Sequence, residues 1–269
     1  MKRRSSGSGI VGLKIDLVKA YDRVDWGLLT RIISKLAFSS KVNALILCCI
    51  SPDSVELLLN GSVFSKTDMQ RGLKQEDPLS LFLFTLYSEL LSRMLLKLER
   101  EGRIHGIKIG RSSPPISHLL FAGDILPFCK ANMEEVHEVV DCLNLFCSCL
   151  GQKINYVKSG CFLSKSTKGK LKADIKKSFG LKELTRETKY FGNPMFVSRN
   201  RTKNYEVLKV KVELKLQGWK AKLISQAGKH TLIKSVMSAI PLYTMAAAKL
   251  PSKWCNDIER MSSKEGVFD

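Results

Sequence analysis

The sequence predicts a mixed α/β or α+β fold followed by an all-helical end. Short strand-like runs alternate with helical apolar spacing over residues 14–190, and only the helical spacing continues after about residue 205. With 269 residues, 44% of them hydrophobic and 26% charged, the chain has the composition of a globular protein. This composition excludes a largely disordered chain.

The first predicted elements are a strand, two helices and a hairpin. Lys14–Leu17 is typical of the end of a strand, and residues 19–36 repeat apolar positions with helical spacing. A short helix is expected over residues 44–50. Residues 54–65 predict a hairpin, because Asn60-Gly61 between two apolar runs is the strongest short-range signal for one.

A long helix is predicted over Pro78–Glu101, because proline is favoured in a first helical turn and the leucines that follow share one face. The same signals predict the remaining elements. In chain order these are strands at 104–109 and 116–128 with a turn at Ala122-Gly123-Asp124, a helix at 134–150 closed by Gly151, short strands near 161–163 and 190–191, and helices at 205–216 and 231–240.

The positive charge is concentrated in one stretch. The formal net charge is +19, and residues 151–234 hold 21 basic against 5 acidic side chains, whereas residues 1–150 hold 19 against 16. This excess predicts an anionic partner, either nucleic acid or a membrane surface. No apolar run approaches the roughly 18 residues that span a bilayer, and the N-terminus lacks the apolar stretch of a signal peptide, so we expect no membrane-embedded segment.

The eight cysteines and four histidines form no metal-binding or disulfide pattern. Cys48 and Cys49 are adjacent, three more cysteines cluster at 142–149, and there is no CxxC pair. Zinc sites and disulfide frameworks are therefore poor fits, and we expect reduced core cysteines in an intracellular protein. The sequence does not decide between nuclear and cytoplasmic residence.

Asp16 and Asp124 are the candidate catalytic carboxylates. Asp16 closes the first strand and Asp124 lies at a hairpin turn. Nucleotidyl transfer on two divalent ions needs carboxylates from separate elements that converge on metals about 3.5–4 Å apart. Position alone leaves alternatives open, since aspartates at such places also cap helices or form turns.

Five sequence blocks and a C-terminal region, in order from about Lys14 to Arg260, resemble the reverse transcriptases of plant non-LTR (long interspersed) retrotransposons. The five blocks are Lys14-Ile-Asp-Leu-Val-Lys-Ala-Tyr-Asp-Arg-Val-Asp-Trp26, Arg71-Gly-Leu-Lys-Gln-Glu-Asp-Pro-Leu-Ser80, Ser117-His-Leu-Leu-Phe-Ala-Gly-Asp124, Gly151-Gln-Lys-Ile-Asn-Tyr-Val-Lys-Ser159 and Lys189-Tyr-Phe-Gly-Asn-Pro194. The region that resembles the thumb consists of Leu216-Gln-Gly-Trp-Lys220, Ser225-Gln-Ala-Gly-Lys229 and Leu232-Ile-Lys-Ser-Val236.

The resemblance implies an α+β fold of the right-hand polymerase type, in which an antiparallel palm sheet packs on helices and a helical thumb follows. The expected parts are a short basic flexible N-terminus over residues 1–13, a palm with partial fingers over 14–200 and a thumb-like region over 201–269. Since only 13 residues precede Lys14, we expect a truncated and degenerate domain. The implied partners are an RNA template with a DNA primer, or duplex nucleic acid, and the implied cofactor is Mg²⁺ or Mn²⁺.

The resemblance also assigns roles to single residues. Asp16 and Asp124 match the metal-binding catalytic carboxylates, and Lys158 matches a lysine to which protonation of the leaving pyrophosphate is ascribed. The nucleotide-binding residues are implied to be Tyr21, Gln75 and Arg71, with Tyr21 the aromatic that tests the incoming sugar for a 2′-hydroxyl. The structural alternatives are a core aromatic at Tyr21 and a solvated surface lysine at Lys158.

The departures from the family fall on the chemistry. The family's hairpin reads Phe-Ala-Asp-Asp, whereas this chain reads Phe121-Ala-Gly-Asp124, so the third metal-ligand position is occupied by Gly123. Glu76 stands where the family has glycine, and Leu81 replaces a proline. Pro127 removes a ladder donor from the second hairpin arm, which predicts an edge strand there. We therefore expect an impaired enzyme, with a loss of rate on the order of a thousandfold or more.

No spare carboxylate is expected to compensate for Gly123. Asp22 and Asp25 are the nearest in the first block, and we expect both to lie along the helix that follows Asp16, out of reach of the site. An active polymerase that relies on Asp16 and Asp124 alone remains the alternative. A further alternative is a chain that does not fold stably.

The lysine-rich stretch predicts a grip on nucleic acid, because lysines that neutralise phosphates give binding with little sequence preference. A nucleic-acid-binding protein without catalysis, which uses residues 151–234, is therefore the second functional hypothesis. Trp219 is a candidate stacking aromatic, although a core position is the alternative for it. The candidate phosphate-binding side chains are Lys209, Lys211, Lys215, Lys220 and Lys222.

Overall fold

The computed structural model describes residues 9–51, 54–110, 112–185, 188–190, 193–196, 204–220, 225–237, 239–247 and 249–263. The chain forms two compact units, Met1–Leu184 and Thr185–Asp269. The boundary that the sequence predicts near 200–205 falls mostly on residues outside these ranges and stays a prediction.

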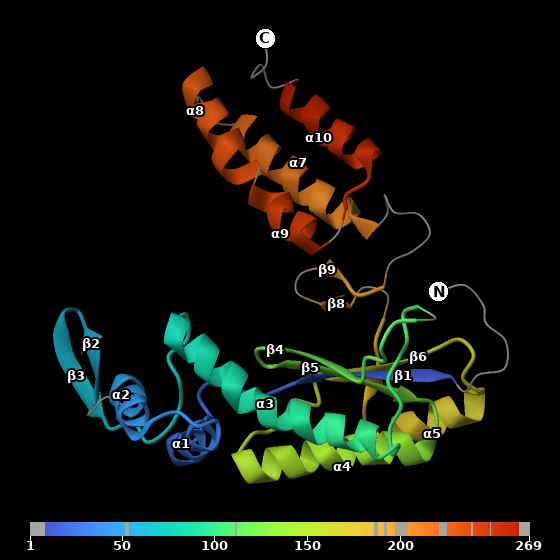
Figure 1. The fold of residues 1–269 in the computed structure, drawn as a ribbon. Helices are drawn as coiled ribbons and strands as arrows, with labels where there is room; N and C mark the ends of the chain where they lie inside the picture. The colour runs from blue at the N-terminus through green and yellow to red at the C-terminus, as the bar shows by residue number, and fades with distance from the viewer. Residues whose placement is uncertain are drawn as a thin grey trace. The chain divides into compact units, whose positions relative to one another are not determined.

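The first unit is built on a five-stranded sheet with the strand order β4-β5-β1-β6-β7 (Figure 1). All neighbours pair antiparallel except β6 and β7, which pair parallel. The strands span Ile10–Asp16 (β1), His118–Phe121 (β4), Asp124–Lys130 (β5), Gly160–Leu163 (β6) and Lys182–Glu183 (β7). Strand β1 is therefore central, and β5 and β6, which follow one another in the sequence, lie on either side of it.

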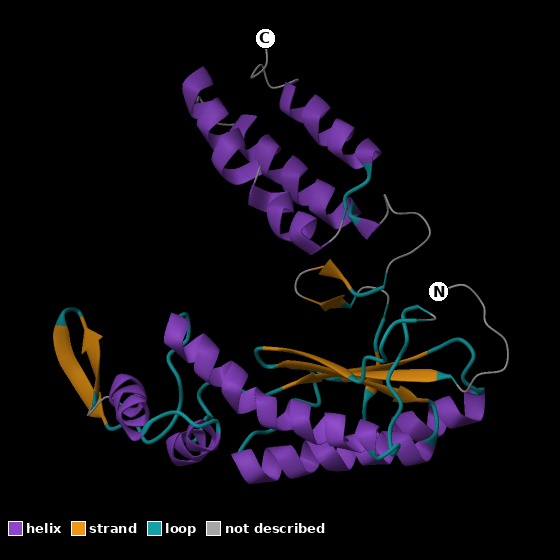
Figure 2. Ribbon diagram, viewed as in Figure 1, coloured by secondary structure: helices purple, strands orange, loops and turns teal. Residues whose placement is uncertain are grey.

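Three helices cover one face of this sheet, as Figure 2 shows. They are α3 (Pro78–Arg100), α4 (Met133–Leu150) and α5 (Gly169–Phe179). Helix α3 begins at the Asp77 cap with proline in its first turn, and α4 ends at Gly151 in the left-handed conformation, so the local signals in the sequence set both boundaries.

Strand β1 divides its side chains strictly between the two faces. Val11, Leu13, Ile15 and Leu17 are buried in the main core with the apolar faces of α3 and α4. Since successive residues of a strand point to opposite faces, the even-numbered residues point away from the helices. Lys14 and Asp16 are consequently placed on the face of the sheet that the helices leave open.

A small helical and hairpin segment lies beside the sheet. Helices α1 (Trp26–Lys35) and α2 (Ser40–Ile50) precede strands β2 (Val55–Leu59) and β3 (Ser62–Thr67). Asn60 and Gly61 both have positive φ values, 52° and 81°, as the predicted two-residue turn requires. Every residue of the two strands is exposed, including Leu57, Leu58 and Phe64.

Two helix predictions need correction, and a third helix was not predicted. The helix predicted from residue 19 begins at Trp26, because residues 18–23 form turns and Asp25 caps the helix by accepting a hydrogen bond from Leu28. Asp22 and Asp25 therefore lie before that helix and not along it. Helix α2 begins at Ser40 rather than at residue 44, and α5 was not predicted, because only Ile175 of its residues is buried.

Pro127 lies in an interior strand, which corrects the expectation of an edge. The backbone N–H of Phe128 donates to Ser117 O on the β4 side, so by alternation the missing N–H of Pro127 faces β1. The paired positions of β1 and β5 stop at Gly12–Phe128 and resume at Ile15–Ile125. The sheet thus accommodates the proline as a local gap without a change of register.

The second unit is helical, apart from the short pair β8 (Lys189–Tyr190) and β9 (Asn193–Pro194). Its helices are α7 (Glu206–Lys220), α8 (Gln226–Leu232), the π-helical η1 (Ile233–Met237), α9 (Ala239–Ala247) and α10 (Ser252–Ser263). Buried Trp254 donates from Nε1 to Tyr205 O at 3.2 Å, and Val212 and Leu216 on α7 form a second core. The helices predicted after residue 205 are confirmed in the described part of this unit.

Helix α3 is long and apolar enough to cross a membrane by length and composition, the one such helix among the described residues. Its most apolar side, with Leu83, Tyr87, Leu91 and Leu95, is buried in the core of the first unit. Packing in this core accounts for the apolar residues on that side of the helix. The cysteines differ from the expectation of core positions, since Cys48, Cys49 and Cys149 are exposed.

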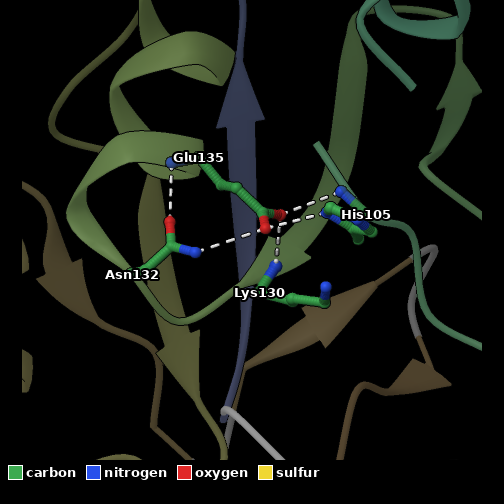
Figure 3. Close-up of polar contacts among 4 residues, drawn as sticks. All are labelled: His105, Lys130, Asn132 and Glu135. Atoms are coloured by element: carbon green, nitrogen blue, oxygen red, sulfur yellow. Dashed lines mark hydrogen bonds and ion pairs between the residues drawn. The ribbon is translucent and has the colours of Figure 1, made fainter. Parts of the chain in front are cut away.

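A buried carboxylate joins three segments of the first unit, as Figure 3 shows. Glu135, in the first turn of α4, accepts hydrogen bonds at Oε2 from the backbone N–H groups of His105 and Lys130, at 2.8 and 3.0 Å. Its Oε1 lies 2.9 Å from His105 Nδ1 and 3.2 Å from Asn132 Nδ2, and its own N–H donates to Asn132 Oδ1. Asn132 thus caps α4, and the carboxylate of Glu135 fixes the loop after α3 to the end of β5.

We expect Glu135→Gln to lower the free energy of unfolding by about 2–4 kcal/mol, because backbone donors would be left without their charged acceptor. Urea denaturation followed by circular dichroism measures this change. Glu134→Gln is the matched control, since Glu134 is the exposed neighbour on the same turn and its loss should cost less than about 0.5 kcal/mol. Equal effects of the two substitutions would contradict the role of Glu135.

His118 connects β4 to α3 as a neutral side chain. Its Nδ1 lies 3.1 Å from Ser117 Oγ and its Nε2 lies 3.0 Å from Ser92 Oγ, and burial lowers the pKa of the imidazole below its ordinary value. Because the unfolded chain then binds a proton more readily than the folded one, stability that is present above pH 6.5 is lost as the pH falls through the lowered pKa.

We therefore expect His118→Asn to reduce the difference in unfolding free energy between pH 7.5 and pH 5.5. Chemical denaturation at the two pH values gives this difference. His137→Asn, at an exposed position on α4, should leave it unchanged. The assignment fails if both variants keep the pH dependence of the wild type.

Candidate functional site

Asp16 and Asp124 stand directly opposite one another on β1 and β5. The N–H of Leu17 donates to Gly123 O, which makes the next pair along the ladder a hydrogen-bonded one. By alternation Asp16 and Asp124 form a non-hydrogen-bonded pair, in which side chains on one face approach most closely, with Cβ atoms about 4.5–5.5 Å apart. The two predicted carboxylates therefore share the open face of the sheet.

A lysine that the sequence analysis did not single out contacts one of these carboxylates. Lys14 Nζ lies 3.0 Å from Asp124 Oδ1, and the two side chains are only 13% and 23% exposed. Lys14 precedes Asp16 by two residues and so shares its face, and it reaches Asp124 along the diagonal of the strand pair. The alternation of side chains along a strand indicated the face on which Lys14 lies. Its partner, Asp124, follows only from the register of β1 with β5.

The turn after β1 is held by backbone hydrogen bonds to the fourth sequence block. Asp16 N–H donates to Ser159 Oγ at 3.0 Å, and Asp16 O accepts from Asn155 N–H at 2.8 Å. One residue pair further on, Val18 N–H donates to Lys153 O at 2.8 Å. The position of Asp16 thus depends on main-chain atoms and on one serine hydroxyl.

The second block binds to the same turn from the other side. Gly72 N–H donates to Val24 O, Leu73 N–H donates to Tyr21 O, and Trp26 Nε1 donates to Gly72 O at 2.7 Å. Gly72 has φ = 102°, and a Cβ there would lie 3.2 Å from the backbone of Asp22. Only glycine fits this close contact without strain.

The glutamine of the second block points to the turn as well. Gln75 Nε2 lies 3.4 Å from Asp22 Oδ1, and both residues are exposed. The next residue, Glu76, has φ = 65°, in the left-handed region that favours glycine. Glutamate at a family glycine position is therefore strained by about 1 kcal/mol or more, as well as negatively charged.

Tyr21 packs as a half-buried aromatic at the edge of the core. Its ring stacks on that of Phe84 in α3, with centroids 4.5 Å apart and an angle of 13° between the planes. Burial raises the pKa of its hydroxyl. A core contact and a ligand-facing edge are compatible here, because Phe84 covers one face of the ring.

The backbone geometry at residue 123 does not require glycine. The third carboxylate is therefore missing because of the amino acid at this position and not because of the fold. The described backbone at this residue does not lie in the left-handed region, so other amino acids can adopt it. A Cβ would lie 3.2 Å from Ala20 Cβ, which a shift of a few tenths of an ångström relieves. An aspartate could therefore be accommodated.

Lys158 and Arg71 lie at the periphery of this arrangement. Both are exposed, and Lys158 is fixed through its backbone, whose N–H donates to Asn155 O at 3.2 Å. Neither side chain is among those that the described contacts bring to Asp16 or Asp124. Their assigned roles stay predictions.

The residues present do not match a two-ion centre. Such a centre needs several carboxylate oxygens on metals about 3.5–4 Å apart. The described residues contain no group of three histidine, cysteine, aspartate or glutamate side chains that could hold a metal ion. The two carboxylates that do face one another are not both free, because Lys14 holds Asp124.

The lysines that are candidates for binding phosphates differ in their surroundings. Lys209 is half-buried and lies 2.9 Å from Asp257 Oδ2 on α10, and this hydrogen bond raises the pKa of the lysine. Lys211 and Lys215 are exposed on α7, one helical turn apart. The side chains of Trp219 and Lys220, and the whole of Lys222, lie outside what the structure describes.

Comparison with known proteins agrees with the five sequence blocks. The family model described as reverse transcriptase (RNA-dependent DNA polymerase) matches residues 2–205. An uncharacterized mitochondrial protein of Arabidopsis thaliana is 43% identical over 67 residues, which are 25% of this chain and 55% of that protein. An uncharacterized 149 kDa protein of transposon TX1 from Xenopus laevis is 22% identical over 265 residues, which are 96% of this chain and 19% of that protein.

The chain thus spans about half the length of one of these relatives and a fifth of the other. Among solved structures, telomerase from Candida tropicalis in complex with a fragment of telomeric RNA aligns with a TM-score of 0.52 and 11% identity. The alignment covers 98% of this chain and 39% of that one, and at this identity it shows the polymerase fold alone.

Members of this family generally use divalent metal ions. The fold, the opposed Asp16 and Asp124 and the backbone contacts among the blocks all agree with the family match, which covers well over half of the chain. The chain belongs to the reverse transcriptase (RNA-dependent DNA polymerase) family, and its resemblance to the enzymes of non-LTR retrotransposons is confirmed.

Proposed function

We propose that this reverse transcriptase domain binds nucleic acid but has lost efficient nucleotidyl transfer. The observation that carries the proposal is Gly123, which removes a carboxylate from a site whose backbone framework is otherwise intact. Strain and negative charge at Glu76 act in the same direction. A polymerase that works with Asp16 and Asp124 alone is the competing hypothesis.

The expected partner is a template–primer duplex, with RNA as template and DNA as primer. Three observations support this: the family is that of RNA-dependent DNA polymerases, the telomerase of similar fold was solved with RNA, and 21 of the 44 basic residues lie in 151–234. Binding through phosphates has little sequence preference and depends strongly on salt. Mg²⁺ or Mn²⁺ is the ion expected of any residual activity.

Primer extension on an RNA template tests the loss of chemistry. We expect the wild type to stay at background with Mg²⁺ or Mn²⁺. Gly123→Asp, alone or combined with Glu76→Gly, should raise the rate by about a thousandfold, because a metal-ligand oxygen contributes several kcal/mol of transition-state stabilisation. Gly123→Ala introduces the same contact with Ala20 without a carboxylate and should stay inactive.

Two outcomes would count against this assignment. Extension by the wild type that Asp16→Asn abolishes would overturn the proposed loss of activity. Failure of Gly123→Asp/Glu76→Gly to gain activity, in a protein that still binds duplex, would show that these two positions do not account for the loss.

Binding of a labelled RNA–DNA duplex at increasing salt concentration tests the proposed binding of nucleic acid through its phosphates. We expect log affinity to fall linearly with log salt concentration, and Lys211→Ala/Lys215→Ala to make the slope less negative by about 2, since each phosphate contact contributes about 1. Lys35→Ala/Lys41→Ala removes two exposed lysines outside residues 151–234 and should leave the slope unchanged. No retention of duplex at low salt would refute the binding function.

A further inference from the structure

The contact between Lys14 and Asp124 has the character of an internal counter-ion. The ammonium group lies 3.0 Å from Oδ1, and both side chains are shielded from water, at 13% and 23% exposure. Ion pairs shielded in this way are screened by salt much less than surface pairs. The contact therefore occupies one of the two carboxylates that the register places together.

The charge of the site follows from its members. With ionised side chains, Asp16 and Asp124 contribute −2 and Lys14 contributes +1, so the open-face cluster carries −1. A carboxylate at position 123 would restore −2 in the presence of the same lysine. Gly123 and Lys14 thus act together. Because position 123 has no carboxylate, the cluster holds two negative charges, and Lys14 neutralises one of them.

A divalent ion would have to compete with this lysine. An ion bridging Asp16 and Asp124 would displace the ammonium group from Oδ1 or lie beside it, and like charges within a few ångströms repel one another. The strand register fixes Lys14 to the same face two residues before Asp16, so the side chain has a single side of the sheet on which to lie.

We propose that Lys14 is the resident cation of Asp124 and, with glycine at position 123, closes this site to a divalent ion. The inference rests on the proposed loss of nucleotidyl transfer and adds its electrostatic basis. It makes Lys14 a residue that determines which cation the carboxylate pair accepts. It also predicts that Asp124 contributes nothing to metal affinity in the chain that has both Lys14 and Gly123.

Titration of the full chain with Mn²⁺, followed by calorimetry or by the electron paramagnetic resonance of free Mn²⁺, tests this without nucleotide or nucleic acid. We expect Lys14→Met and Lys14→Gln to bind Mn²⁺ about tenfold more tightly or better, and Lys14→Arg to show no gain because it keeps the cation. The gain should vanish in Lys14→Met/Asp124→Asn. Lys153→Met, which removes an exposed lysine near the same turn, should leave the affinity unchanged.

Asp124→Asn in the wild-type background decides the proposal without any change at Lys14. We expect it to leave Mn²⁺ affinity unaltered, and a loss of affinity would overturn the proposal. Lys14→Met and Lys14→Gln proteins that fold, by circular dichroism, yet bind Mn²⁺ as weakly as the wild type would also overturn it. Primer extension by the wild type would refute the proposed function together with the closed site, whereas unchanged Mn²⁺ binding in the Lys14 variants would refute the role of Lys14 alone, so the two failures are distinguishable.

Discussion

The central position of β1 is the constraint on which the first unit depends. The strand pairs with β5 and β6, and its odd-numbered side chains fill the core above α3 and α4. A shift of register by one residue would bury Lys14 and Asp16 and expose Val11, Leu13 and Ile15, at a cost of several kcal/mol of apolar burial. The same apolar packing that stabilises the sheet therefore keeps the charged residues on one face.

The framework around Asp16 is made largely of main-chain atoms. Leu17, Val18 and Asp16 bond to the hairpin turn and to the fourth block through backbone groups, and Gly72 and Leu73 bond to the turn in the same way. Such bonds do not depend on the identity of the catalytic side chains. A domain of this kind can therefore lose a carboxylate and retain its fold.

The sequence predicted the hairpin, the long helices and both opposed aspartates, because each had a local signal: Asn60-Gly61, Pro78 with its leucine face, and the family strings. The helix start at Trp26 was missed because Tyr21 and Val24 are held by long-range contacts, through backbone bonds to the second block, and so imitate helical spacing. Lys14 was missed since its partner lies 110 residues away and only the strand register brings the two together. Glu135 gave no signal for a similar reason, because one of its donors, His105, lies 30 residues away.

The hairpin of β2 and β3 has a consequence for the chain in solution. Both strands carry apolar residues that are 57–69% exposed, namely Leu57, Leu58, Leu59, Val63 and Phe64. The two strands pair with no others among the described residues. Two-stranded ribbons are marginal alone, and an apolar edge pairs readily with another chain. We therefore expect the hairpin to limit the concentration at which this protein stays dispersed, whereas the core beneath the sheet sets its resistance to unfolding.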